Sequence, residues 1–159
     1  MISTSAGQLV LTSLRDEDRA PVEVRPGPAR LMREVFAVAV RRCFAGRDPR
    51  DVTPYVRGLL ERRGVSSDGV AARELEAVIR SVLGEPELVA GIPDERRVGM
   101  MIVVVGDLAQ GAAADGAITG AELLEALVAQ AETRVARFDP PPDGRPWRRS
   151  SPRPVRGPR

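Results

Sequence analysis

The sequence contains no lysine, no histidine and no asparagine, and it has only one cysteine. Without histidine, Ser-His-Asp and Cys-His catalysis, histidine general bases and nearly every zinc or haem site are excluded. Without lysine, Schiff-base chemistry and Walker-type phosphate loops are excluded as well. All 24 basic residues are arginine, so any binding that needs a cation must use arginine. We expect no cofactor and no metal site.

Long apolar runs and paired cysteines are also missing. The longest apolar run, residues 98–105, is interrupted by Gly99 and is far shorter than the roughly 20 residues that span a membrane. The N-terminus has neither a basic region nor a sustained apolar stretch typical of a signal peptide. The single Cys43 cannot form an internal disulfide, so nothing indicates an oxidising compartment. We therefore expect a cytoplasmic protein without a membrane segment.

The formal net charge of +2 is divided unevenly along the chain. Residues 139–159 contain 6 arginines, 2 acids and 7 of the 14 prolines, whereas residues 1–138 contain 18 arginines and 20 acids. The C-terminal segment has too few large apolar side chains to offset the entropy of ordering. Residues 139–159 are therefore predicted to form a disordered, basic tail beyond a mildly acidic body.

The tail has three interpretations. Arg148 and Arg149 can follow a nucleic-acid backbone while Trp147 stacks on a base. The same Pro-rich segment can instead be a ligand for a partner domain, or it can be a solubilising tail that binds nothing.

Residues 1–27 are predicted to be a mobile N-terminal segment. The stretches GQLVLTSL (7–14) and PVEVR (21–25) are rich in β-branched and apolar residues, and a charged loop lies between them. This composition is compatible with a short β-hairpin. An isolated hairpin is marginally stable in water, so it would have to dock on the rest of the chain to be ordered.

Residues 28–138 have the period of amphipathic helices. Glycines and N-capping residues divide this region into helices from Pro28 to Gly46, from Thr53 to Gly64, from Ser67 or Asp68 to Gly84, from Asp94 to Ala112, and from Thr119 to Phe138. Residues 98–105 alone would also suit a buried strand, but the helical period continues through Leu108. The prediction is an all-α domain of about five helices in a compact bundle or orthogonal array.

An Asp-Gly helix start occurs twice, 47 residues apart, in segments that begin at Ser66 and Ala112. It indicates either an old duplication or two independent helix N-termini. The second copy resembles the C-terminal half of an EF-hand loop, since Asp115, Gly116, Ile118 and Glu122 have the expected offsets. The upstream ligand positions are Gly111 and Ala113, which supply no side-chain oxygen, so calcium binding is not expected.

The same Asp-Gly before an acidic, capped helix is similar to helix starts of TerB-type tellurite-resistance domains. That resemblance covers about a dozen residues and implies a small helical fold. A structural turn at Asp115 and Gly116 is the simplest interpretation.

Residues 59–74 resemble a helix-turn-helix, with the turn at Gly64 and a second helix that would enter the major groove. Arg63 and Arg73 occupy positions that are normally apolar, and Gly69 replaces a residue that is normally Thr or Ala. An ordinary helical corner is the alternative.

Arg41, Arg42, Arg47 and Arg50 are clustered near the end of the first predicted helix. They can complement the helix dipole and pair with Asp48 and Asp51, or they can form an anion patch. Cys43 lies among apolar helix positions and is expected to be a small core residue without reactivity.

These observations favour a non-enzymatic helical interaction or regulatory module. It would bind a protein partner or self-associate through an apolar helix face, for which residues 98–112 and 119–138 are the richest in apolar side chains. The alternative is a nucleic-acid-binding regulator that uses residues 59–74 and the tail. A carboxylate enzyme is a third class, and it would require Glu74 to converge with Asp107 or Asp115.

Overall fold

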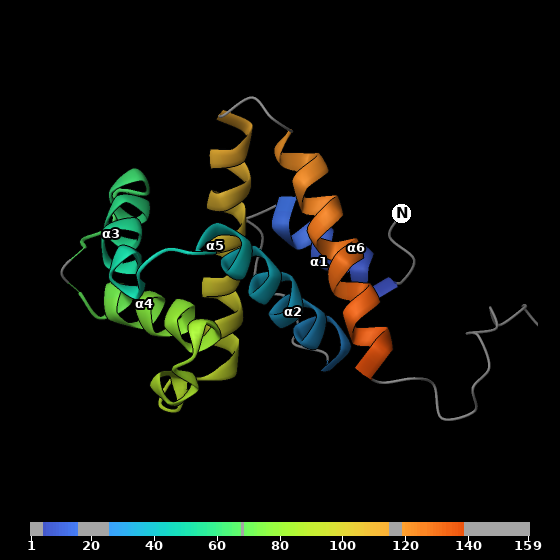
Figure 1. Ribbon diagram of the computed structural model, residues 1–159, viewed down its shortest axis with the longest axis horizontal. Helices are drawn as coiled ribbons and strands as arrows, with labels where there is room; N and C mark the ends of the chain where they lie inside the picture. The colour runs from blue at the N-terminus through green and yellow to red at the C-terminus, as the bar shows by residue number, and fades with distance from the viewer. Residues whose placement is uncertain (1–4, 16–25, 68, 115–118, 139–159) are drawn as a thin grey trace, which may run out of the picture.

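The computed structural model of the protein describes residues 5–15, 26–67, 69–114 and 119–138. These residues form α-helices and two short 3-10 helices, with no strand among them (Figure 1). In chain order the elements are α1 (Ser5–Arg15), α2 (Pro26–Cys43), η1 (Pro49–Asp51), α3 (Val52–Arg62), α4 (Val70–Leu83), η2 (Pro86–Val89), α5 (Asp94–Ala114) and α6 (Gly120–Phe138). The all-α prediction is confirmed, with one α-helix more than expected. The predicted tail, including Trp147, Arg148 and Arg149, lies outside the described residues.

The long helix α5 lies between two groups of helices (Figure 1). On one side α1, α2 and α6 pack against each other and against α5, and on the other side α3 and α4 form a corner that η2 extends. Because neighbours contact α5 on more than one side, it must be apolar around much of its circumference. Val98, Val104 and Val105 are accordingly all buried.

Residues 98–105 are therefore helical, and the strand alternative is wrong for them. One stripe of α2, formed by Val35, Phe36 and Val40, is also fully buried. Helix α2 contacts α1, α5 and α6, so this stripe is the centre of the hydrophobic core.

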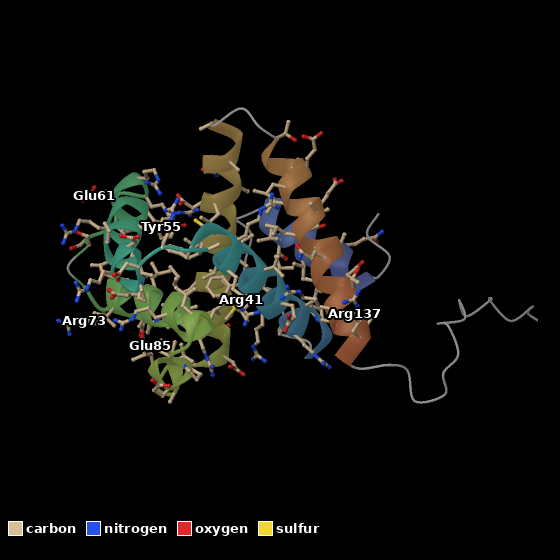
Figure 2. All side chains as sticks on the ribbon, in the orientation of Figure 1. Arg41, Tyr55, Glu61, Arg73, Glu85 and Arg137 are labelled. Atoms are coloured by element: carbon tan, nitrogen blue, oxygen red, sulfur yellow. The ribbon has the colours of Figure 1, made fainter. Side chains whose placement is uncertain are left out.

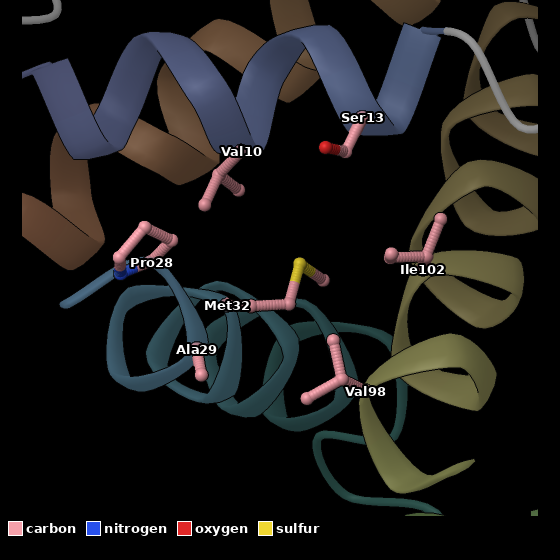
Figure 3. A pocket seen from close by; sticks show the side chains of 7 residues that line it. All are labelled: Val10, Ser13, Pro28, Ala29, Met32, Val98 and Ile102. Atoms are coloured by element: carbon pink, nitrogen blue, oxygen red, sulfur yellow. The ribbon is translucent and has the colours of Figure 1, made fainter. Parts of the chain in front are cut away.

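The hairpin predicted for the N-terminal segment is wrong for residues 7–14, which belong to helix α1. Val10 and Leu14 are four residues apart and both are buried, so one helical stripe docks α1 on the body. Figure 3 shows Val10 and Ser13 of α1 facing Met32 of α2 and Ile102 of α5. The space left between them is about 10 Å³, room for one water molecule at most. The second predicted strand, residues 21–25, lies outside the described residues.

The helix ends were predicted well by glycine and less well by capping side chains. Gly64 and Gly84 follow α3 and α4 and have φ values of 68° and 126°. Residues with a side chain larger than hydrogen rarely adopt this backbone conformation. At the start of α4, however, the N-cap residue is Gly69, which has no capping side chain, and the predicted cap Asp68 lies outside the described residues. Thr53 lies inside α3 and donates its hydroxyl to Glu76 of α4.

The capping box predicted at the start of α6 is confirmed. Glu122 N–H donates to Thr119 Oγ1 at 3.2 Å, and Thr119 N–H donates to Glu122 Oε2 at 2.9 Å. The Thr119 hydroxyl also donates to Glu122 Oε2 at 2.8 Å, and the two hydrogen bonds from the Thr119 N–H and hydroxyl lower the pKa of Glu122 below its usual value. The box caps the N-terminal end of α6, which packs against α5.

None of the helices in the described ranges has the length and apolarity that a membrane crossing requires.

Candidate functional site

A cleft of about 770 Å³ opens where the C-terminal end of α2, helix α3, the second half of α5 and the first half of α6 meet. It is lined by Ala39, Arg42, Cys43, Tyr55, Arg62, Asp107, Leu108, Gln110, Gly111, Ala112, Ala114, Leu123 and Leu127. Ligand sites in helical proteins are commonly found between helices and have volumes of this order. The cleft is therefore the candidate binding site.

The wall that α5 and α6 supply is mainly apolar. Leu108 and Ala112 from α5 face the cleft together with Leu123 and Leu127 from α6. The α5 residues at the cleft run from 107 to 114, which is about 10 Å of helix at 1.5 Å per residue. Gly111 lies beside open space, because a Cβ atom added there would meet no heavy atom within 4 Å. The cleft thus has an apolar wall and free room along α5, and we call this part of it the groove.

Where α3 faces α5, three polar side chains form one cluster. Tyr55 donates its hydroxyl to Asp107 Oδ2 at 3.0 Å, and Arg62 donates Nε and Nη2 to Asp107 Oδ1 at 3.1 and 2.9 Å. Tyr55 and Arg62 are seven residues apart on α3 and so share one face of that helix. The cluster holds α3 against α5 and forms the polar end of the cleft.

The members of this cluster differ in their exposure to solvent, and burial changes the pKa of Tyr55. The Asp107 side chain is only 11% exposed, whereas Arg62 is 57% exposed and keeps contact with solvent. Burial and the neighbouring Asp107 raise the pKa of the Tyr55 hydroxyl far above its usual value. Tyr55 also packs edge-to-face on Phe44, with ring centroids 5.5 Å apart. Both carboxylate oxygens already accept hydrogen bonds, so the arrangement is suited to fixing a wall rather than to moving a proton.

Cys43 lines the cleft as a half-buried residue. Burial raises the pKa of its thiol, Arg47 lowers it, and Asp107 raises it again, with a net upward shift. The thiol is therefore protonated at neutral pH and is a poor nucleophile. This agrees with its expected role as a small packing residue.

The arginines at the end of α2 take different positions. Arg41 and Arg42 are both exposed in the last turn of α2, but only Arg42 lines the cleft (Arg41 and Tyr55 are labelled in Figure 2). Within the described residues neither forms the predicted ion pair with Asp48 or Asp51. Asp48 instead accepts the backbone N–H of Arg50 at 2.8 Å. The predicted pairing is wrong, while the placement of both cations at the helix C-terminus suits its dipole.

Residues 59–74 form the corner between α3 and α4. The connection is seven residues long, 63–69, whereas the turn of a helix-turn-helix has three or four. Arg63 and Arg73 are exposed, so the two charges that depart from the motif do not enter the core. Val70 is 63% exposed in the first turn of α4, beside Arg73. The first turn of α4 is thus exposed to solvent, as the motif requires. The connection that precedes α4 is longer than the motif allows.

The carboxylates considered for catalysis each have their own arginine partner. Glu74 Oε2 lies 3.0 Å from Arg96 Nε, and Asp107 is held by Arg62. Asp115 lies outside the described residues. Across the described ranges, no group of three potential metal-ligating side chains occurs.

Sequence reasoning singled out Arg42 and Cys43 but missed the cluster of Tyr55, Arg62 and Asp107 as a unit. One signal was present, because Asp107 is an acid inside the apolar period of α5, and such a residue requires a partner when it is buried. Its partners lie 45 and 52 residues earlier in the chain, and no local pattern identifies them.

Comparison with known proteins returns no match to a protein-family model, to a curated protein or to a solved structure.

Proposed function

We propose that the protein is a non-enzymatic interaction module that binds a helical segment of a partner protein in the cleft between α2, α3, α5 and α6. The observation that carries this proposal is the apolar wall of α5 and α6, in which Leu108 and Ala112 are partly exposed and the cleft has free room beside Gly111. Apolar surface of this kind is a normal feature of protein interaction sites.

The length of the groove supports a helix as its occupant. The cleft follows α5 for about 10 Å, which is also the axial distance between positions i and i+7 of a helix. Helices that bind in grooves place apolar anchors at positions i, i+3 or i+4, and i+7. One such helix, lying along α5, brings its anchors to Leu108, Ala112 and Leu123.

The polar groups of the cleft support binding over catalysis. Asp107 is fully engaged by Tyr55 and Arg62, and Cys43 has a raised pKa. A general base needs an accessible lone pair and a catalytic thiol needs a lowered pKa, and these residues offer neither.

The test is to fill the groove with a side chain. A library of helical peptides is selected on the full-length protein, and the affinity of one selected peptide is measured for the Ala112→Trp and Ala126→Trp variants. Ala112 lines the cleft, whereas Ala126 is exposed on α6 and does not. We expect Ala112→Trp to weaken binding by at least tenfold and Ala126→Trp to leave it unchanged. Equal binding by both variants would overturn the proposal.

Two further measurements keep the test decisive. If Ala112→Trp does not fold, Gly111→Leu replaces it, because a side chain at Gly111 points into open space. Sizing chromatography over a concentration series tests the second copy of the chain as the occupant. The alternative result is a dimer whose fraction rises with protein concentration and which the Ala112→Trp variant does not form. That result would show that the cleft binds a second copy of the chain, and the proposal of a partner helix would be wrong.

Nucleic-acid binding is a second candidate because Val70 and Arg73 are exposed together on the first turn of α4. It predicts a DNA gel shift that weakens with salt and that Arg73→Glu abolishes. Arg137→Glu, which changes an exposed arginine of α6 (Figure 2), is the control. A shift that deletion of residues 139–159 abolishes, but Arg73→Glu does not, would assign the binding to the tail.

A further inference from the structure

The polar end of the cleft has a positive charge excess. Arg42 lies at the cleft and is exposed, and it forms no ion pair with any acid of the described ranges. The one acid that lines the cleft, Asp107, is neutralised by Arg62. Arg47 is near enough to lower the pKa of Cys43, so a third cation acts on the same end.

Arg62 adds a second contact point. Its bonds to Asp107 use Nε and Nη2, and Nη1 takes no part in them. Nη1 lies over Gly58, 3.2 Å from the place where a Cβ would be, so the guanidinium is held close to the helix surface. A guanidinium that is positioned in this way still offers donors on its outer edge, with its side chain 57% exposed.

We propose that the partner segment is an acidic amphipathic helix. In this proposal, which rests on the proposed function, its apolar face lies on Leu108, Ala112 and Leu123, and a Glu or Asp at one edge binds the Arg42 guanidinium and the free edge of Arg62. A carboxylate matches the forked donors of arginine, and the pair is strengthened beside an apolar wall that excludes water. The charge sets which helices bind and in which direction they lie, while the apolar wall supplies most of the affinity.

A small amphiphilic acid offers the same chemistry as an acidic helix. The groove favours the helix because its apolar wall continues for two turns of α5 beyond the arginine end. Free decanoate therefore serves as the competing ligand in the test.

The experiment is a double-mutant cycle on the full chain. The peptide selected above is compared with an analogue in which its acidic residues are replaced by Gln or Asn. Both are titrated against the unmodified protein, Arg42→Glu and Arg41→Glu. Arg41 is the matched control, because it has the same residue type, helix turn and exposure but lies outside the cleft.

We expect the selected peptides to be rich in Asp and Glu, and neutralising those residues to weaken binding about tenfold. Arg42→Glu should cause a similar loss with the acidic peptide and little further loss with the neutral one. Arg41→Glu should change either affinity less than twofold. Since the pair is partly exposed, the difference between the two peptides should shrink as salt is added.

The failures are distinguishable. If the selected peptides are neutral or basic and Ala112→Trp still blocks them, the groove binds helices and the acidic partner is wrong. If no peptide is selected, or if Ala112→Trp has no effect, the proposed function itself is wrong. If decanoate binds the cleft and is blocked by Ala112→Trp while peptides do not bind, the occupant is a small acid and the helix proposal fails.

Discussion

Replacement of Asp107 by alanine removes the residue that joins α3 to α5. In the native protein its Oδ2 accepts the Tyr55 hydroxyl at 3.0 Å and Arg62 Nη2 at 2.8 Å, and its Oδ1 accepts Arg62 Nε at 3.1 Å. No other hydrogen bond of Tyr55 or Arg62 to a side chain in the described ranges replaces these. The variant should therefore lose stability and loosen the polar end of the cleft at the same time.

The magnitude follows from the different exposure of the two donors. The Tyr55 hydroxyl is part-buried, and a buried donor that loses its acceptor costs about 1–3 kcal/mol. Arg62 is 57% exposed and regains water, so the loss of its pair contributes about 0.2–1 kcal/mol. Removal of a carboxylate that is only 11% exposed returns part of its desolvation cost. The free energy of unfolding should fall by about 2 kcal/mol.

Urea unfolding followed by circular dichroism measures this difference. Glu61→Ala is the control, because Glu61 lies on α3 with the two partners of Asp107 but is exposed, and its loss should change the free energy by less than about 0.5 kcal/mol. Tyr55→Phe removes the orphaned hydroxyl, so the double variant Tyr55→Phe/Asp107→Ala should be less destabilised than the sum of the single changes. An unchanged free energy for Asp107→Ala, or simple additivity in the double variant, would refute this account of the cluster.

Three other predictions follow from single positions. Gly120→Ala should lower the melting temperature, because its Cβ would lie 3.1 Å from the carbonyl oxygen of Ala109. Gly99→Ala has open space for its Cβ and should stabilise the helix by roughly 0.5–1 kcal/mol. A higher melting temperature for Gly120→Ala than for Gly99→Ala would contradict the packing. Tyr55 is the only tyrosine and its pKa is raised in the folded protein, so absorbance at 295 nm should show no phenolate near pH 10. Because the pKa is higher in the folded than in the unfolded state, the free energy of unfolding should fall as pH rises above about 10. Titration of Tyr55 near pH 10 in the folded protein would contradict the cluster. Iodoacetamide should modify Cys43 at pH 8 more slowly than it modifies the urea-unfolded chain, as read by mass spectrometry, and equal rates would show that the thiol is not shielded.

Local signals were sufficient to predict most of the helices. The buried stripe of α2, the glycines after α3 and α4, and the capping box at Thr119 all depend on residues within a turn or two of each other. The ambiguity at residues 98–105 was resolved by the continuation of the period beyond them. The structure supplies the physical reason for this apolar composition, since helices pack on more than one side of α5.

Features that depend on distant residues were not predicted. In α1, the cluster of Val, Leu and Thr suggested strands, but tertiary burial of Val10 and Leu14 on α2, α5 and α6 selects a helix. The sequence also did not distinguish Arg42 from Arg41, because which neighbour reaches the cleft depends on how α3 and α6 are placed around the end of α2.

The most direct test of the binding cleft is the chemical-shift change that the selected peptide causes in the ¹⁵N- and methyl-labelled protein. The account predicts that the largest changes occur at Leu108, Ala112 and Leu127, together with the backbone of Arg42. Largest changes at Val65 and Val70, the exposed valines around the α3–α4 corner, would contradict it and place the interaction surface at that corner, outside the cleft.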